Sequence, residues 1–234
     1  MRRIRNDRLI RRNSLLGRGL LFGGLGILVA GSLVSLSGPV ALLPFVVVAV
    51  ASMLISQVGI AMMARWGRGP RLDEVIDAGL KGLDDRYTVV HYTLGAPHTL
   101  LAPSGVYALV PVVEDGWLRE SGGRWARSLP RRGRLRPARE EAMPDLSRRA
   151  QREAAKLRRS LAGRRAGASE LTVRPLLLFV SPKAQVEATP EADPPALHIK
   201  KLKDWLRHQP RHPSLRAEAL SDLASRLGLA PQEP

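Results

Sequence analysis

Three acidic side chains are candidates for binding a divalent metal. Glu114 and Asp115 are adjacent and precede Gly116, and Glu74 lies in a segment with helical periodicity. Carboxylate oxygens are the ligands that Mg²⁺ prefers, so these residues could hold the ion of a hydrolytic site. We favour a structural interpretation of each. Glu74 would lie in the first turn of a helix, where the helix dipole stabilises acids, and the Glu114-Asp115-Gly116 sequence is typical of a turn.

The histidines offer a second kind of chemistry. His208 and His212 are four residues apart, as two metal ligands on one helix would be, but neighbouring prolines break such a helix and favour a solvated tail. His91 and His98 lie in predicted strands, where we expect ordinary hydrogen bonds. The chain has no cysteine, which excludes disulfides and thiolate metal sites. Without a phosphate-binding glycine loop or a nucleophile motif, we predict no catalytic residue, no metal and no cofactor.

The strongest chemical signal is positive charge. The formal net charge is +16, and the segment from Arg119 to Arg165 holds sixteen Lys or Arg residues against five acids. Such a surface needs an anionic partner, either nucleic acid or acidic lipid. Trp117 and Trp125 could stack on bases, although we favour burial in the core. The arginines expected to contact this partner are Arg124, Arg127, Arg131, Arg132, Arg134, Arg136, Arg148 and Arg149.

A long apolar segment, residues 15–64, precedes these residues, and its only charge is Arg18. A Ser-Gly-Pro sequence divides it into Leu15–Leu36 and Val40–Ala64. Each half has about the twenty apolar residues that cross a bilayer as a helix. We therefore predict a two-helix transmembrane hairpin that anchors the chain in a lipid bilayer. Small residues for close packing of its helices are Gly23, Gly24, Gly26 and Gly31.

Both flanks of this hairpin are basic. Residues 1–14, a basic N-terminus, and residues 65–71, a juxtamembrane linker, contain nine arginines and a single acid. By the positive-inside rule, both ends of the hairpin and the soluble domain lie in the cytoplasm. A cleaved signal peptide is the alternative, but the first apolar run is long, has no small-x-small cleavage site and is followed by a second span. We expect an integral protein of the bacterial plasma membrane.

After residue 71 the pattern is that of a soluble α/β domain. The order of its elements predicts a mixed sheet flanked by helices over residues 72–208, then a C-terminal helix and tail over 209–234. Pro111 indicates an edge position or a bulge in the third strand. The predicted helices are Leu72–Leu83, Asp145–Ala162, Lys200–Arg207 and Ser214–Leu227, and the predicted strands are Tyr87–Thr93, His98–Ala102, Val106–Val113, Trp117–Arg119, Leu171–Ser181 and Leu197–Ile199. The helix Asp145–Ala162 would bury Leu146, Ala150, Ala154, Leu157 and Leu161.

Several short motifs in this domain carry a resemblance to a known family. They are His98-Thr-Leu-Leu-Ala-Pro-Ser-Gly-Val-Tyr107, then Asp115-Gly116 and Gly123-Arg-Trp125. Together they resemble the central motif of the NERD (nuclease-related) domain, over roughly Leu72 to Arg207. The resemblance implies a restriction-endonuclease-like fold, in which an aspartate before the histidine of the second strand and an acid-x-lysine pair on the third bind a divalent metal.

This sequence departs from that family at the metal site. The matching positions are Pro97, Val110 and Val112, and none of these side chains can supply an oxygen ligand. The resemblance therefore implies a degenerate site and a non-catalytic nucleic-acid-binding or scaffold protein. Two other functions stay open. One is an interaction protein whose arginines face acidic lipid, and the other is a divergent nuclease whose relocated ligands are Glu74 with Glu114 or Asp115.

Overall fold

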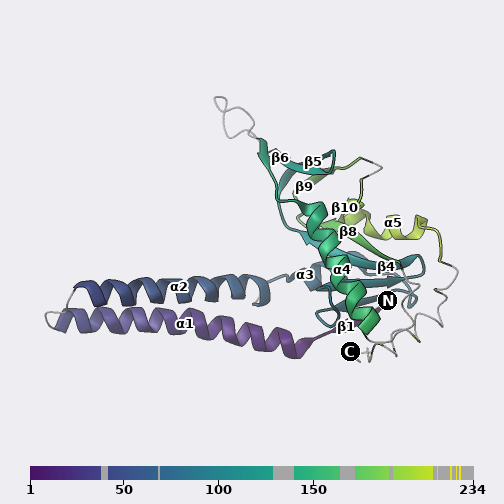
Figure 1. Ribbon diagram of the computed structural model, residues 1–234. Coiled ribbons are helices and arrows are strands. Elements are labelled where there is room, and N and C mark those ends of the chain that lie inside the picture. Colours follow the sequence, from purple (N-terminus) through teal and green to yellow (C-terminus); the bar gives the residue numbers. More distant parts are fainter. Residues whose placement is uncertain are drawn as a thin grey trace. The chain divides into compact units, whose positions relative to one another are not determined.

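The computed structural model describes residues 1–37, 42–67, 69–128, 140–163, 172–189 and 192–212, with Leu215, Asp222, Ser225 and Leu227. The chain divides into two compact units (Figure 1). One unit is Asn6–Arg71. The other combines Met1–Arg5 with Leu72–Pro234, so the first unit is an insertion into the second.

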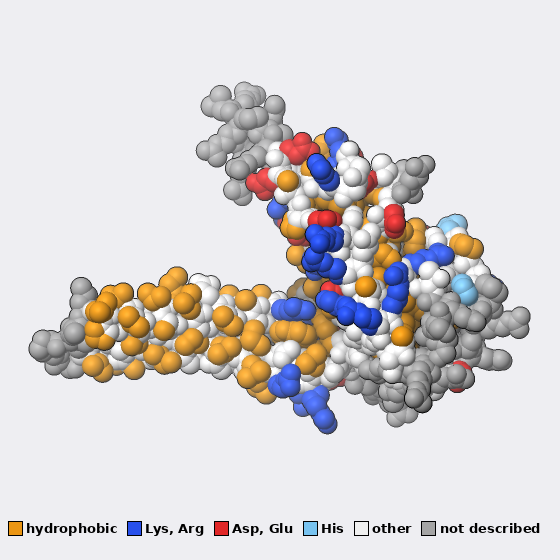
Figure 2. Space-filling model, in the orientation of Figure 1, with side chains coloured by type: hydrophobic (Ala, Val, Ile, Leu, Met, Phe, Trp, Pro, Cys, Tyr) orange, Lys and Arg blue, Asp and Glu red, His pale blue; other side chains and the backbone are white. Residues whose placement is uncertain are grey.

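The unit Asn6–Arg71 is a pair of long apolar helices, α1 (Asp7–Ser37) and α2 (Leu42–Trp66). Both are long enough and apolar enough to cross a membrane, since each contains an 18-residue stretch with a mean hydropathy of 2.0 in α1 and 2.2 in α2. Their apolar side chains are largely exposed, which leaves the orange surface of this unit in Figure 2. Asn6 caps the start of α1, because its Oδ1 accepts a hydrogen bond of 3.0 Å from the Leu9 N–H.

Glycines allow α1 and α2 to pack closely. A Cβ on Gly24 would lie 2.4 Å from Ser56 Oγ, and a Cβ on Gly59 would lie 2.4 Å from the Leu21 nitrogen. Of the four predicted packing glycines, Gly24 and Gly31 face α2. Gly23 and Gly26 do not, since a Cβ there would have no atom within 4 Å. The predicted small-residue face is therefore half right.

The larger unit is built on a six-stranded mixed sheet, which confirms the predicted α/β class. Its strand order is β1-β2-β3-β4-β8-β10. β2, β3 and β4 form an antiparallel meander, whereas β1 pairs with β2, β8 with β4 and β10 with β8 in parallel. The strands are β1 (Arg2–Arg5), β2 (Thr88–His91), β3 (His98–Ala102), β4 (Gly105–Val112), β8 (Val173–Phe179) and β10 (Ala196–His198).

The N-terminus differs from the sequence prediction. Residues 1–14 are not a separate basic arm, because Arg2–Arg5 forms β1 and pairs with Thr88–His91 of β2. Ile4 is buried in the domain core at 6% exposure. The first long helix starts at Asp7 rather than Leu15, since arginines are good helix formers and extend it beyond the apolar segment.

A second, four-stranded sheet has the order β7-β6-β5-β9. The predicted strand Trp117–Arg119 lies within β5, and the other three strands of this sheet were not predicted. The strands are β5 (Gly116–Ser121), β6 (Arg124–Ser128), β7 (Glu140–Ala142) and β9 (Ala184–Glu187).

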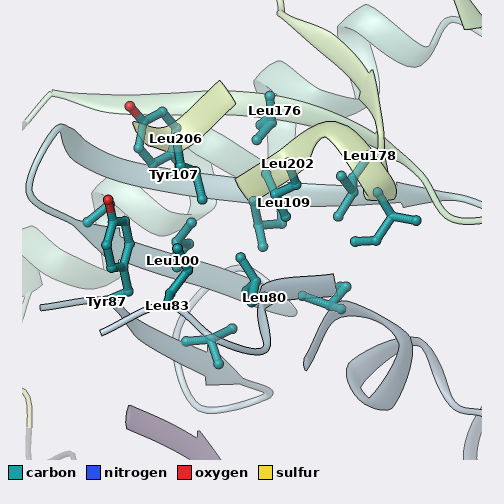
Figure 3. Packing of buried hydrophobic residues seen from close by; sticks show 14 of the residues in the cluster. Leu80, Leu83, Tyr87, Leu100, Tyr107, Leu109, Leu176, Leu178, Leu202 and Leu206 are labelled. Carbon is teal, nitrogen blue, oxygen red and sulfur yellow. The ribbon is translucent and has the colours of Figure 1, made fainter. Parts of the chain in front are cut away.

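Helices cover both faces of the six-stranded sheet. α4 (Leu146–Gly163) packs on one face, and α3 (Leu72–Leu80), η2 (Ile199–Lys201) and α5 (Leu202–His208) lie on the other. Alternation along β4 serves both layers. Val106 and Ala108 join the cluster under α4, and Tyr107 and Leu109 join the cluster under α3 and α5, which Figure 3 shows.

Pro111 does not mark an edge strand, because β4 lies between β3 and β8. The Val112 carbonyl accepts a hydrogen bond from the Val180 N–H at 2.9 Å, so Val110 and Val112 direct their backbone groups toward β8. The backbone nitrogen of Pro111 therefore points to the β3 side of β4. There β3 starts at His98, in register with Leu109, so β3 does not extend as far as Pro111. At that point its missing N–H leaves no ladder bond unmade.

The C-terminal segment contributes to the core rather than forming only a tail. Most of the predicted helix Ser214–Leu227 lies outside the described residues. Leu215 and Leu227 are described, and they are buried at 4% and 1% exposure in the cluster beneath α4.

Candidate nucleic-acid interface

A strongly basic surface of the soluble unit lies on α4. Its five predicted buried residues are all confirmed, with exposures of 1% or less. On a helix of 3.6 residues per turn, five cations fall within an arc of about 100° on the opposite side, over a length of about 16 Å. Figure 2 shows Lys and Arg side chains gathered over this helix. These exposed cations, called the α4 basic face below, are Arg148, Arg149, Arg152, Lys156 and Arg159.

Little negative charge offsets this face. Lys156 forms an ion pair of 2.7 Å with Glu153. Within the described part of the chain, no ion pair is found for Arg148, Arg149 or Arg152. Asp145, the residue before the helix, caps it by accepting a hydrogen bond of 2.8 Å from the Arg148 N–H. The face is thus a row of exposed cations on one side of a packed helix, in which Lys156 is paired with Glu153 and Arg159 Nε donates to the Ala155 carbonyl at 3.5 Å.

The remaining predicted arginines divide into three groups. Arg124 is exposed on β6, at the start of that strand. Arg127 has a structural role, because its Nε donates to the Asp115 carbonyl at 2.6 Å. The predicted contacts Arg131, Arg132, Arg134 and Arg136 lie outside the described residues.

The β4 positions that the resemblance assigns to a metal site lie in the hydrophobic core. Val110 and Val112 are 2% and 1% exposed, and they belong to the cluster where the start of α4 packs between the two sheets. Trp125 lies in the same cluster at 3% exposure, with its ring 5.0 Å from that of Phe179. The prediction that Trp125 is a core aromatic is confirmed. Pro97 contributes its carbonyl, which accepts a hydrogen bond of 2.8 Å from the Tyr92 N–H.

The candidate metal ligands are distributed over different elements. Glu74 is exposed in the first turn of α3, and Glu114 is half-buried between β4 and β5. Asp115 accepts a hydrogen bond from the Ser181 hydroxyl at the ends of β4 and β8. Among the described residues, no three His, Asp or Glu side chains gather in a way that could hold a metal ion.

His208 and His212 do not form a metal pair on one helix. His208 is exposed within α5, and its ring Nδ1 lies 2.7 Å from the Asp204 carbonyl. The His212 N–H lies beyond the helix and donates to the Pro103 carbonyl at 2.8 Å. The helix ends between them, as the prolines in the sequence predict.

Three polar side chains form a hydrogen-bonded row that the sequence predicted only in part. His91 Nδ1 and His98 Nδ1 lie 2.8 Å apart, and His91 Nε2 lies 3.2 Å from an Asp77 carboxylate oxygen. Both histidines are almost fully buried, at 0% and 2% exposure, so their prediction as hydrogen-bonded residues is confirmed. Their places at facing ends of two predicted strands could have indicated the pair. The contact with Asp77 could not have been found this way, because Asp77 lies on α3, and only tertiary packing brings that helix to the two histidines.

Hydrogen bonds of Glu120 hold the small sheet together. The Thr189 hydroxyl donates to its carboxylate at 2.6 Å, and the Gly123 N–H donates at 2.7 Å. These bonds, with that from Thr189 first, lower the pKa of Glu120 below its ordinary value. The carboxylate therefore joins β5 to the β5–β6 turn and to the segment after β9.

Comparison with known proteins identifies no relative. No protein-family model matches the chain, and no curated protein and no solved structure match it. Inferences about function therefore depend on the residues and geometry described above.

Proposed function

We propose that this chain is a membrane-anchored, non-catalytic protein whose soluble domain binds nucleic acid through the α4 basic face. The observation that carries the proposal is the row of five exposed cations on a helix whose opposite side is locked into the core. Because the apolar side of α4 is already buried, this helix can offer a partner only its charge.

The charge and length of the face suit a phosphate backbone. One strand of a DNA duplex carries a phosphate per about 3.4 Å of axis, so about 16 Å of helix lies along roughly five phosphates of one strand. Guanidinium groups bind phosphate oxygens through paired hydrogen bonds. Contacts of this kind release counterions and make affinity strongly dependent on salt.

The proposed lack of catalysis follows from the residues at the nuclease-like positions. We propose that the domain is a degenerate member of the NERD family, with a restriction-endonuclease-like fold. Phosphodiester hydrolysis of this type needs carboxylates that hold a divalent ion beside the scissile bond. Val110 and Val112 offer only methyl groups, and they face buried apolar neighbours instead of solvent. A nucleic acid could be held by such a domain without being cut.

The proposed membrane topology has support from strand pairing. β1 precedes α1 in the chain, β2 follows α2, and these two strands pair with each other. Both ends of the hairpin must therefore lie on the same side of any membrane that it crosses. The nine arginines of its flanks favour the cytoplasmic side.

Nucleic-acid binding can be tested with the full chain in nanodiscs of neutral lipid. Arg148→Gln/Arg152→Gln removes two cations from the α4 basic face, and Lys200→Gln/Lys201→Gln removes two exposed cations from the opposite layer as a matched control. We expect the first variant to weaken binding to labelled DNA and RNA and to reduce the slope of log affinity against log salt by about one per arginine. The control should bind as the wild type does. Equal behaviour of the two variants, or no binding at low salt, would refute the proposal.

The lipid function is the second candidate, and short connections favour it. β1 is joined to α1 by Asn6 alone, and five residues, 67–71, join α2 to α3. Lipid binding would replace nucleic-acid binding as the proposed function if the chain binds no nucleic acid but sediments with added vesicles of acidic lipid. Arg148→Gln/Arg152→Gln should then abolish this sedimentation.

The nuclease function remains a third candidate. Metal-dependent cleavage of nucleic acid that disappears with Glu114→Ala would support it.

A further inference from the structure

Trp117 is an exposed aromatic side chain on the soluble unit. Its exposure is 54%, and Val113, at 57%, is the other large apolar side chain found exposed in the described part of that unit. The prediction that both tryptophans of the basic segment are core residues is therefore wrong for Trp117, whereas Trp125 is buried. An exposed indole offers a partner a flat apolar surface on which a ring can stack.

Trp117 lies on the outer face of the small sheet. Strand alternation places Trp117, Arg119 and Ser121 of β5 on this face, while Leu118 is buried on the inner one. The residues opposite Trp117 are Ser128 on β6 and Gln185 on β9, whose polar side chains leave the ring open. Arg119 follows on the same face and forms an ion pair of 3.1 Å with Glu187.

The tip of the β5–β6 hairpin lies against the start of α4, the helix that carries the α4 basic face. Arg124 pairs with Ser121 across β5 and β6, so it lies on the same side of the sheet as Trp117. The residue before it, Gly123, has a carbonyl that accepts a hydrogen bond of 3.5 Å from Ser147 Oγ in the first turn of α4. Beneath this contact, Trp125 packs in one cluster with Leu146. The two surfaces therefore belong to one firmly packed body.

We propose that the nucleic acid bound by the α4 basic face is single-stranded and that one of its bases stacks on Trp117. The inference rests on the proposed function. An unpaired base can turn its ring toward the indole, whereas a base inside a duplex is already stacked on its neighbours. The strand would place phosphates along the α4 basic face, pass Arg124 and end with a base on Trp117.

The experiment uses the full chain in neutral nanodiscs, with a labelled single strand and the same sequence as a duplex. Trp117→Ala removes the ring, Trp117→Phe keeps an aromatic surface, and Val113→Ala is a matched control at the neighbouring exposed position. We expect Trp117→Ala to weaken single-strand binding about tenfold and to leave duplex binding unchanged. Trp117→Phe and Val113→Ala should bind the single strand nearly as the wild type does.

Tryptophan fluorescence supplies a second measurement, which uses the wild type and the conservative variant Trp117→Phe and does not depend on Trp117→Ala being folded. The single strand should quench part of the wild-type emission, and Trp117→Phe should lose that quenching while it keeps its affinity. Tighter binding of the duplex, or equal single-strand affinity of Trp117→Ala and the wild type, would overturn the inference and leave the proposed function intact. Failure to bind either nucleic acid would instead reject the proposed function. If Trp117→Ala impairs only binding to acidic vesicles, the ring contacts lipid and the inference is wrong.

Discussion

A substitution at Val110 can distinguish a hydrophobic core position from a metal site. A core would be destabilised by an acidic side chain at this position, whereas a metal site would accept one. Its side chain is 2% exposed and lies with Leu118 and Leu177 in one apolar cluster. A carboxylate placed there would be buried without a partner. We expect Val110→Asp to lower the free energy of unfolding by about 3 to 5 kcal/mol, measured by thermal unfolding of the full chain in detergent.

Val113→Asp is the control for this substitution, because Val113 is nearby in sequence and 57% exposed. It should change stability by less than about 0.5 kcal/mol. If Val110→Asp is tolerated equally well, then water or ions reach the nuclease-like positions and the proposed loss of the metal site is wrong.

Glu120 gives a pH-dependent prediction. Its pKa is lowered by hydrogen bonds from Thr189 and Gly123, so the folded state favours the charged carboxylate. That stabilisation is complete above the carboxyl pKa of the unfolded chain and is lost as pH falls through the folded-state pKa. We expect Glu120→Gln to cost about 1 kcal/mol at neutral pH and the difference to vanish in acid.

Stability against pH, measured by denaturant unfolding of both proteins, checks this sign. Glu187→Gln serves as the control, since Glu187 is an exposed carboxylate whose ion pair with Arg119 should contribute little. A difference between wild type and Glu120→Gln that grows in acid would contradict the assignment.

Among the helices and strands, those with a clear pattern of apolar residues were the ones that the sequence predicted. The spacing of Leu146, Leu157 and Leu161 was enough to predict the buried side of α4, because a two-sided helix has one way to pack on a sheet. The continuous apolar run in β8 likewise indicated a central strand. These two elements hold the α4 basic face in place, so its described arginines were predictable as a surface.

Two of the missed strands, β1 and β7, have no such pattern. β1 is Arg-Arg-Ile-Arg and β7 is Glu-Glu-Ala, and neither alternates polar and apolar residues over a useful length. Their backbones become strands because β2 and β6 offer open edges, which is a tertiary effect that local sequence does not contain. The exposure of Trp117 also depends on this second sheet, so the sequence could not separate it from Trp125.

The helical hairpin carries a prediction about its glycines. Gly24 faces α2 closely, whereas a side chain on Gly23 would meet open space. Gly24→Leu should therefore force α1 and α2 apart, and Gly23→Leu should not. The chain has no cysteine, so a pair introduced as Gly31→Cys/Val48→Cys can report the distance by disulfide formation, because a Cβ on Gly31 lies 3.6 Å from Val48 Cγ1.

Gly24→Leu should reduce the yield of that disulfide severalfold, and Gly23→Leu should leave it at the level of the parent protein. Equal yields in the two backgrounds would mean that the helices do not depend on this glycine for their packing.

For the whole molecule, the position of the hairpin within the chain restricts the topologies that it could have in a membrane. The hairpin interrupts the domain after β1, and β1 must pair with β2 to complete the six-stranded sheet. Two crossings satisfy this condition, and one crossing does not. Single cysteines at Arg3, Ser121 and Ser37 can be labelled in sealed vesicles with a reagent that does not cross the bilayer. We expect Arg3→Cys and Ser121→Cys to react from the same side and Ser37→Cys from the opposite side.

Detergent should make all three cysteines reactive, which controls for burial of the thiols. Labelling of Ser37→Cys from the same side as the other two would show that α1 and α2 lie along the bilayer instead of crossing it. Labelling of Arg3→Cys from the side opposite to Ser121→Cys would be incompatible with β1–β2 pairing. The expected pattern would place the basic flanks, the paired strands and the α4 basic face in one compartment, where a nucleic acid could reach them.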